Sequence, residues 1–466
     1  MTKYLLTSEK ERIHSLITSL SKVLNVSEEE LFNIENHMKI ILRDTKDASI
    51  EDILNKYYSL LESDMRTILD KRITQALQFG IKNDIFSIVG YEGTFNSKPI
   101  NENTYFSFDS ISKVLVSVII MLLVREKQIS LKDTVNSYNQ KFNMDASVED
   151  ILKFTAMIQT EKRIDNLSKE ETIAILKNVR ENIKEKSMYK NYYQYNDIGY
   201  MILRLSVPDF LDRLDKLLIG IDKNNLTYKN MENIDNITGG KLGEEYITPD
   251  PKGRSILLPG HTGMYGNIEG LLNLFNNLFY NDKILTFAEK EILLRQPYTD
   301  SVVYTKDGKQ MVGKNNSLQY MAKVAGVYRK PLNIKDNNYN KLASCDLSNL
   351  TTDMALASAG TCGSWVMGDD LSWSNQFGSY VGGILTNPYS YVNVGKYPDA
   401  RNMIEGTELM VNQNGVILGY SGKLNHYKEV ICEYGILLEL LTEYIKSTDM
   451  DVTLGKEYKL VKKIQK

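Results

Sequence analysis

The sequence predicts an α/β (α+β) fold, in which an antiparallel sheet is flanked by helices and joined to a mainly helical domain. Two observations predict this class. Apolar residues recur first at helical spacing, then in strand-like runs, then in a long helical stretch, and finally in strands followed by a helix. The chain also has 466 residues, which is enough for a large core and for two or three domains.

The first 60 residues are expected to be helical, because Leu31, Ile34, Met38 and Ile41 recur at helical spacing. The other expected elements are helices over 65–79, 114–125, 268–279 and 430–445, a strand over 85–91, a mainly helical stretch over 130–230 and a strand-rich stretch over 355–420. The patterns divide the chain into an N-terminal helical extension (1–63), a main domain (64–445) with a helical insert (about 125–345), and a C-terminal tail (446–466).

Composition excludes several classes of function. The net charge is −3, from 56 basic and 59 acidic residues, so no basic excess indicates a nucleic-acid partner. Three cysteines and four histidines are few for a metal cluster, and we expect no metal and no cofactor. The odd cysteine count fits a reducing compartment.

The N-terminus lacks a leader-like apolar run, and residues 114–124 are too short for a membrane span of about 20 residues. We therefore expect a cytoplasmic protein whose partner is a small molecule, and the sequence leaves its oligomeric state open.

A Ser-x-x-Lys motif, Ser110-Ile111-Ser112-Lys113, precedes the apolar helix expected over 114–125. At the start of a helix, residues i and i+3 lie on one face, so the amine of Lys113 can reach the hydroxyl of Ser110. A serine hydroxyl is a poor nucleophile until a neighbouring base takes its proton. A lysine can serve as that base where burial or nearby positive charge lowers its pKa. The motif therefore indicates a nucleophile and its base.

The segment 105–126 resembles the nucleophile region of the serine β-lactamase and penicillin-binding-protein superfamily, which includes class C β-lactamases, DD-peptidases and family VIII esterases. In that superfamily an aromatic-rich turn precedes Ser-x-x-Lys and a long apolar helix follows. Its second motif is Tyr-x-Asn, often continued by x-Gly-Tyr. Residues 195–200, Tyr-Asn-Asp-Ile-Gly-Tyr, resemble it with aspartate at Asp197. The resemblance implies a β-lactamase/transpeptidase-like fold and makes Tyr195 the group that shuttles the proton to the leaving group.

The third motif of the superfamily is Lys-Thr-Gly or His-Thr-Gly on a strand that lines the site, and the sequence offers two candidates. His261-Thr262-Gly263 matches by letters, but it lies in a glycine-rich loop before a helix. Ser358-Ala359-Gly360 is preferred, because its spacing to the strands downstream resembles the class C pattern. This choice makes Ser358, Gly360 and Thr361 substrate-binding residues, with Asp197, and His261 is kept as a pocket residue.

The resemblance therefore implies a serine hydrolase or acyltransferase that forms an acyl-Ser110 intermediate. Its substrate would be a carboxylic ester or a small amide, which includes amides of D-amino acids. One alternative is a DD-peptidase or β-lactamase, although Ser358 lacks the cation that those enzymes use for a substrate carboxylate. Another is an inactive member with a binding role. A Ser-His-Asp hydrolase is a further alternative, but no Gly-x-Ser-x-Gly elbow is present.

Overall fold

The structure is a computed structural model. It describes residues 28–43, 48–68, 74–83, 85–95, 98–108, 112–139, 142, 144–152, 156, 158–159, 174, 176, 180–181, 197–228, 237–238, 240–242, 245–247, 263–280, 282–294, 301–304, 310–313, 322–324, 327–331, 354–359, 365–368, 380–388, 418–446 and 458–463.

The described helices follow the expected order along the chain. They are α2 (Glu28–Ile41), α3 (Ile50–Ile68), α4 (Ser112–Arg125), α5 (Val135–Tyr138), α6 (Val148–Leu152), α9 (Asp197–Ser206), α10 (Phe210–Ile221), α12 (Ile268–Phe275), a π-helical turn (Asn276–Tyr280), α13 (Phe287–Leu294) and α17 (Leu418–Lys446). The apolar helix expected over 114–125 is confirmed as α4. Among these helices, none is long and apolar enough to cross a membrane.

One large sheet organises the described strands. Its order is β14 (Ala322–Val324), β15 (Val327–Pro331), β16 (Met354–Ala359), β17 (Trp365–Gly368), β18 (Tyr380–Pro388), β1 (Thr74–Asn83), β2 (Phe86–Phe95) and β19 (Tyr458–Lys463), with β3 (Lys98–Pro99) on β2. Neighbouring strands pair antiparallel, except that β19 pairs parallel with β2. The antiparallel sheet flanked by helices is therefore confirmed.

The remaining described strands form small pairings outside the large sheet. They are β4 (Tyr105–Ser107), β5 (Ile158–Gln159), β6 (Arg180–Glu181), β7 (Leu226–Thr227), β8 (Ile237–Thr238), β9 (Gly240–Leu242), β10 (Glu245–Ile247), β11 (Tyr265–Gly266), β12 (Ser301–Tyr304) and β13 (Gln310–Gly313). β4 lies between β11 and β8 in a four-stranded sheet that ends with β7.

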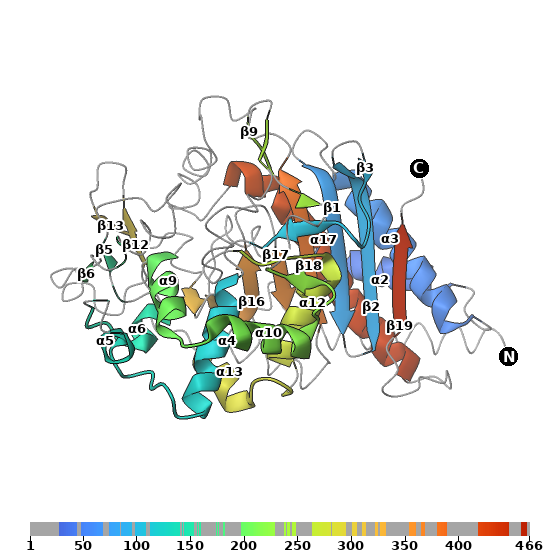
Figure 1. The fold of residues 1–466 in the computed structure, drawn as a ribbon. Helices are drawn as coiled ribbons and strands as arrows, with labels where there is room; N and C mark the ends of the chain where they lie inside the picture. The colour runs from blue at the N-terminus through green and yellow to red at the C-terminus, as the bar shows by residue number, and fades with distance from the viewer. Residues whose placement is uncertain are drawn as a thin grey trace.

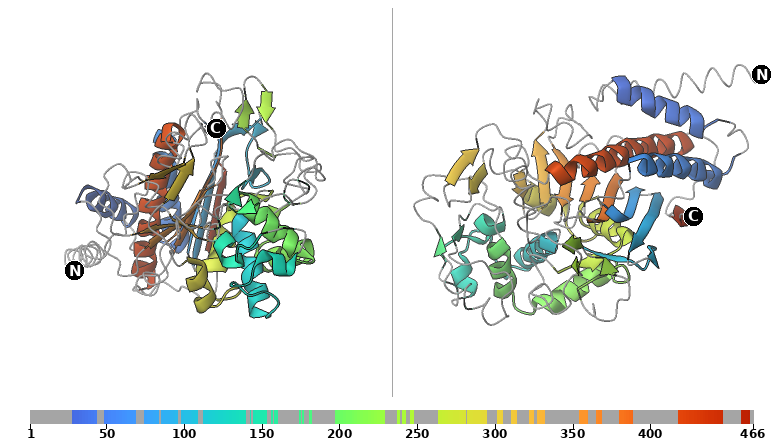
Figure 2. Two further views of the ribbon diagram at one scale, coloured as in Figure 1. Left: turned by 90° about the vertical axis from the view of Figure 1, so that its left-hand side faces the viewer. Right: turned by 90° about the horizontal axis from the view of Figure 1, so that it is seen from above.

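Helices cover both faces of the large sheet. Helix α17 packs on β1 and β18 from one side, with α2 and α3 against it, and α12 packs on the same strands from the other side. Figure 1 shows α4 between the sheet and the helical part that contains α5, α6 and α9, and Figure 2 shows the layers edge-on. The core accordingly has two parts, one on the α17 side and one that joins α12 to α4, α9 and α10.

The helix expected over 65–79 is wrong beyond Ile68, because β1 begins at Thr74. Leu77, Phe79 and Ile81 all belong to the core on the α17 side. Between them, Gln78 is buried and its side chain accepts a hydrogen bond from the backbone N–H of Ile268, at the start of α12. This two-residue alternation is that of a strand with two buried faces.

Candidate active site

Helix α4 carries the predicted base at its N-terminal end. Eleven of its side chains are buried, from Ser112 to Leu123, so the helix runs through the core. Lys113 has an exposed fraction of 0%. A lysine amine in such a place must be held by polar partners or give up its proton, because a lone buried charge is costly. The structure thus gives Lys113 the burial that the sequence predicts for a base.

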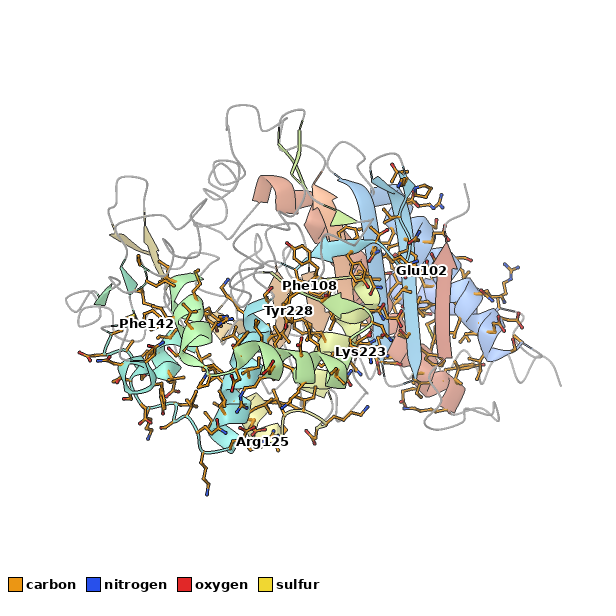
Figure 3. The ribbon with its side chains drawn as sticks, viewed as in Figure 1. Glu102, Phe108, Arg125, Phe142, Lys223 and Tyr228 are labelled. Carbon is orange, nitrogen blue, oxygen red and sulfur yellow. The ribbon has the colours of Figure 1, made fainter. Side chains whose placement is uncertain are left out.

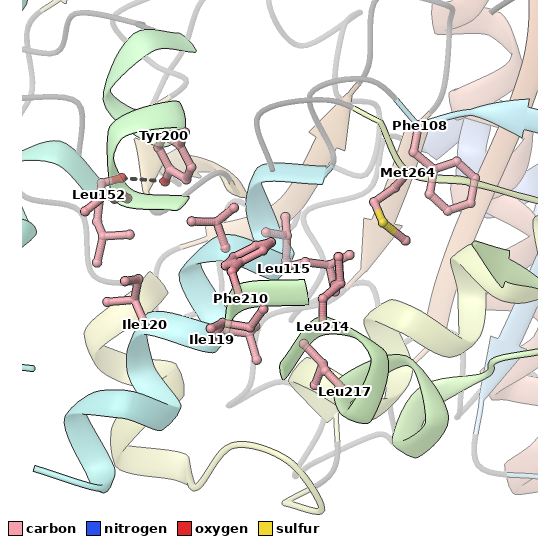
Figure 4. Packing of buried hydrophobic residues seen from close by; sticks show 14 of the residues in the cluster. Phe108, Leu115, Ile119, Ile120, Leu152, Tyr200, Phe210, Leu214, Leu217 and Met264 are labelled. Atoms are coloured by element: carbon pink, nitrogen blue, oxygen red, sulfur yellow. Dashed lines mark hydrogen bonds between the residues drawn. The ribbon is translucent and has the colours of Figure 1, made fainter. Parts of the chain in front are cut away.

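Ser110 lies outside the described residues, but its chain neighbours on both sides are bound to one residue, Met264. The backbone N–H of Phe108 donates to the carbonyl of Met264 at 2.8 Å. The N–H of Met264 donates to Oγ of Ser112 at 3.1 Å. Figure 4 shows Phe108 and Met264 side by side, to the right of the start of α4. Phe108 and Ser112, the described residues before and after the predicted nucleophile, are therefore each joined to Met264 by a hydrogen bond.

Two short strands bring Met264 to this turn. Tyr265 in β11 pairs with Ser107 in β4, and Gly266 pairs with Phe106. A Cβ on Gly266 would lie 2.4 Å from the carbonyl oxygen of Asn225, so only glycine fits there. Asn267 then caps α12, since its Oδ1 accepts from the N–H of Gly270 at 2.9 Å. Met264, Tyr265 and Gly266 thus lie beside β4 and the start of α4, while His261 lies outside the described residues.

A buried glutamine supports the same region from the sheet. Nε2 of Gln78 donates to the carbonyls of Asn101 and Thr104, at 3.0 and 2.9 Å, and its Oε1 accepts from Ile268 at 2.8 Å. Gln78 therefore joins β1, the turn before β4 and the start of α12. Sequence reasoning missed this residue. A polar side chain among Leu77, Phe79 and Ile81 was the signal that could have found it.

Helix α9 begins at Asp197, two residues after Tyr195, and packs on α4 and α6. Its Tyr200 has an exposed fraction of 0%, and burial raises the pKa of the phenol well above its usual value. The hydroxyl donates to the carbonyl of Leu152 at 2.8 Å and lies 3.2 Å from Oγ of Ser117. The structure thus brings the end of the second-motif segment, Tyr200, to the helix that carries Lys113, while Tyr195 itself lies outside the described residues.

Ser358 lies on β16, where it pairs with Val366 of β17. The next residue, Ala359, pairs with Trp365, so the chain between β16 and β17 makes a hairpin. Gly360, Thr361 and His261 lie outside the described residues. Within the described ranges, no group of three or more histidine, cysteine or acidic side chains could hold a metal ion.

The far end of α4 is held by charges. Nε of Arg125 donates to Oε1 of Glu289 at 2.7 Å, and Nη2 donates to the other carboxylate oxygen. The hydrogen bonds from Arg125 lower the pKa of Glu289 to about 2. Figure 3 places Arg125 at the outer end of α4, whereas Phe108 and Tyr228 lie near the centre. This ion pair therefore anchors the helix and takes no part in the site at its other end.

Solved structures with the same fold include a class C β-lactamase in complex with cefoxitin, which has a TM-score of 0.54 and 14% identity and covers 73% of this chain and 96% of its own. A β-lactamase/D-alanine carboxypeptidase from Pseudomonas syringae has a TM-score of 0.52 and 13% identity, with 76% and 97% covered. The chain has the β-lactamase fold.

A class C β-lactamase from Rhodobacter sphaeroides also shares this fold, with a TM-score of 0.51 and 10% identity over 74% of this chain and 96% of its own. No protein-family model matches the sequence, and no curated protein matches it either. At 10 to 14% identity the likeness concerns the β-lactamase fold itself. It confirms the fold that the Ser-x-x-Lys and Tyr-x-Asp segments predict.

Proposed function

We propose that this protein is a serine hydrolase or acyltransferase that forms an acyl-Ser110 intermediate on a carboxylic ester or a small amide, amides of D-amino acids included. The observation that carries the proposal is the complete burial of Lys113 in the first turn of α4. Ser110 precedes it by three residues, and Phe108 and Ser112, on either side of Ser110 in the sequence, are both bound to Met264. The β-lactamase fold adds independent support.

In the proposed acylation, Oγ of Ser110 attacks the carbonyl carbon of the substrate while its proton passes to the amine of Lys113. The tetrahedral oxyanion is stabilised by the backbone N–H groups of Ser110 and Thr361; such a donor is worth about 3–4 kcal/mol in hydrolases. The carbon–leaving-group bond then breaks; Tyr195 gives its phenol proton to the leaving group and takes up the proton held by Lys113, so both groups return to their starting protonation states. Water, or another acceptor, releases the acyl group by the same steps in reverse.

The position of β16 favours Ser358 as the third-motif residue. β16 is followed in the sheet by β17, β18 and β1, whereas Gly263 is followed by a two-residue strand and then α12. A motif on a strand of the main sheet therefore agrees better with 358–360 than with 261–263. Ser358 has no charge, so the proposed site prefers neutral acyl donors, and benzylpenicillin, which carries a carboxylate, should acylate it poorly.

Labelling with a fluorophosphonate probe, followed by intact-mass and peptide mass spectrometry, tests the proposal. We expect one adduct on Ser110 in the wild type and none in Ser110→Ala. Ser206→Ala is the matched control, because Ser206 is a buried serine whose Oγ donates to the carbonyl of Ile202 in its own helix. An adduct on another serine, or a wild-type protein that does not react, would overturn the proposal. A screen of esters and D-amino-acid amides then identifies the acyl group.

A further inference from the structure

Tyr200 joins three helices through one hydroxyl group. Its Oη donates to the carbonyl of Leu152, the last residue of α6, at 2.8 Å, as drawn in Figure 4. The last four carbonyls of a helix have no partner within the helix, so this bond satisfies one of them. The same Oη lies 3.2 Å from Oγ of Ser117 on α4. Tyr200 itself belongs to α9, and both hydroxyl groups are buried.

The hydrogen atoms of this pair can be counted. Oγ of Ser117 has a second acceptor, the carbonyl of Lys113, at 3.1 Å. Among these contacts between described residues, two hydroxyl hydrogens therefore serve three contacts. The shortest contact, from Tyr200 to Leu152, takes the phenol hydrogen, so the serine hydrogen is shared between Lys113 and Tyr200. In this arrangement the phenol oxygen accepts from Ser117, and α9 and α4 are held together by a directional bond.

Glycine at position 199 allows the phenol to reach these partners. A Cβ on Gly199 would lie 2.7 Å from Cγ2 of Ile151 and 3.0 Å from Cδ1 of Ile158. Only glycine lets α9 approach α6 so closely. The Gly-Tyr dipeptide at 199–200 thus acts as one unit, in which Gly199 allows contact and Tyr200 makes the bond.

The hydroxyl pair lies between the two segments that carry the proposed catalytic residues. Ser117 is four residues after Lys113, which places it about one turn further along α4. Tyr200 is three residues after Asp197 and five after Tyr195. A shift of α9 against α4 would therefore move the second motif relative to the lysine.

We propose that Tyr200 is a positioning residue for acylation. Its hydroxyl, through Ser117, fixes the place of α9 on α4 and so the separation of Tyr195 from Lys113. This inference rests on the proposed function and deepens it. Catalytic groups must be held closely, since a misplacement of about 1 Å costs up to about 100-fold in rate.

The test compares Tyr200→Phe, Ser117→Ala and the double variant with the wild type, in the full chain. Two quantities are measured for the fluorophosphonate. One is the maximal labelling rate at saturating probe, and the other is the half-saturating concentration, at which labelling runs at half of that rate. We expect each single variant to lower the maximal rate by about 10-fold to 100-fold and to leave the half-saturating concentration unchanged. The pH of half-maximal rate should shift as well, because the surroundings of Lys113 change. The double variant should be no slower than the slower single variant, because the two hydroxyls act as one unit.

Tyr228→Phe is the matched control. Tyr228 is buried in the same core, and its Oη donates to Oδ1 of Asp215 at 2.8 Å, but that bond is directed to α10. The control should lose thermal stability as Tyr200→Phe does and keep the wild-type labelling rate and pH profile. If Tyr200→Phe does not fold, Ser117→Ala still carries the test.

Each result decides between the two proposals. A wild type labelled on Ser110, with folded Tyr200→Phe and Ser117→Ala variants that keep its rate and pH profile, overturns the positioning role and leaves the proposed function intact. Additive effects in the double variant, or an equal loss of rate in Tyr228→Phe, overturn the positioning role too. A wild type that is not labelled on Ser110 overturns the proposed function and the positioning role with it.

Discussion

The two faces of the large sheet bury polar groups in different ways. On the α17 side, Oδ1 of Asn83 accepts from the N–H groups of Ile85 and Phe86, and its Nδ2 donates to Glu439 and Thr442. These bonds close the turn between β1 and β2 and fasten it to α17. Oη of Tyr57 also donates to the carbonyl of Tyr434 at 2.6 Å, so the polar groups on this side fasten one long helix, α17, to the sheet and to α3.

On the α12 and α4 side, buried polar groups join several short segments to one another. Gln78 links the sheet to the turn before β4, Ser112 links α4 to Met264, and Ser117 links α4 to Tyr200. Burying such groups costs free energy unless every bond is made, so apolar residues would give the same packing more simply. Ser112 and Ser117 lie on either side of Lys113 along α4, so the bonds on this side hold the surroundings of the proposed base, whereas those on the α17 side hold one long helix on the sheet.

The largest expected effect separates these two roles. Lys113→Met should reduce fluorophosphonate labelling by about 100-fold or more, the scale for losing a general base, and the protein should remain folded. Lys290→Met is the control, because Lys290 is also buried, 3% exposed, and its Nζ donates to Asp282 at 2.8 Å on the α13 side. Stopped-flow labelling measures both. Near-wild-type rates in Lys113→Met would show that polar burial on this side does not serve acylation.

The opposite pattern is expected on the α17 side. Leu437 is fully buried in that core, and Leu437→Ala should lower the free energy of unfolding by about 2–5 kcal/mol. The folded fraction should still label at the wild-type rate. Urea unfolding gives the first quantity, and labelling at low temperature gives the second. A folded Leu437→Ala protein that labels slowly would mean that the two sides are coupled.

A moderate effect is expected where the sheet meets the proposed site. Ser358→Lys on β16 should shift preference toward substrates with a carboxylate by about 1–3 kcal/mol, the range for a charge-assisted hydrogen bond. The measurement is kcat/KM on a matched pair of esters, with and without the carboxylate, in both proteins. No shift would remove Ser358 from the third-motif position and favour His261. A wild type that already prefers the anionic ester would require another cation in the site.

The smallest effect concerns a titrating group on the α17 side. Nδ1 of His37 on α2 lies 3.0 Å from Oε1 of Glu433, and Nε2 lies 3.7 Å from Oδ2 of Asp64. The carboxylate of Glu433 raises the pKa of His37, with a smaller contribution from Asp64 and against the effect of burial. The ion pairs therefore stabilise the fold fully below a pH of about 6.5, the pKa of a histidine in the unfolded chain. This stabilisation is lost as the pH rises through the higher pKa of His37 in the folded protein.

The free energy of unfolding, measured from pH 5 to 9, should show this loss, which is at most about 1 kcal/mol for partly exposed ion pairs. His37→Gln should remove it, and labelling of Ser110 corrected for the folded fraction should not change with this variant. A pH dependence that persists in His37→Gln would assign the titration to another group.

Much of the fold could be predicted from sequence because its elements are strongly periodic. The apolar run of α4 and the alternation in β2 needed no tertiary information. The error over 65–79 arose because Ala76, Leu77 and Gln78 also favour helices, so the two-residue period of β1 was missed. Helix α17 begins at Leu418 rather than 430, since Gly419 and Gly422 weaken the helical pattern over its first turns.

The site was predictable only where a motif carries it. Ser-x-x-Lys marks Lys113 because a spacing of three residues at the start of a helix is expected to bring the two groups together. The bonds of Ser112 to Met264 and of Tyr200 to Ser117 join residues 152 and 83 positions apart, and no local pattern encodes such pairs. Assigning Ser110, Tyr195, His261, Gly360 and Thr361 to one site remains a prediction, as do the roles of Asp197 and Ser358.

The parallel strand β19 has a consequence for how this protein behaves in concentrated solution. The outer edge of β2 would otherwise offer a row of unpaired backbone groups over residues 86–91, and such edges recruit strands from other molecules. The last described segment of the chain fills that row, and its sequence includes three lysines, Lys459, Lys462 and Lys463, whose like charges discourage stacking. A truncated form that ends before residue 458 should therefore self-associate, and a tag is better attached elsewhere.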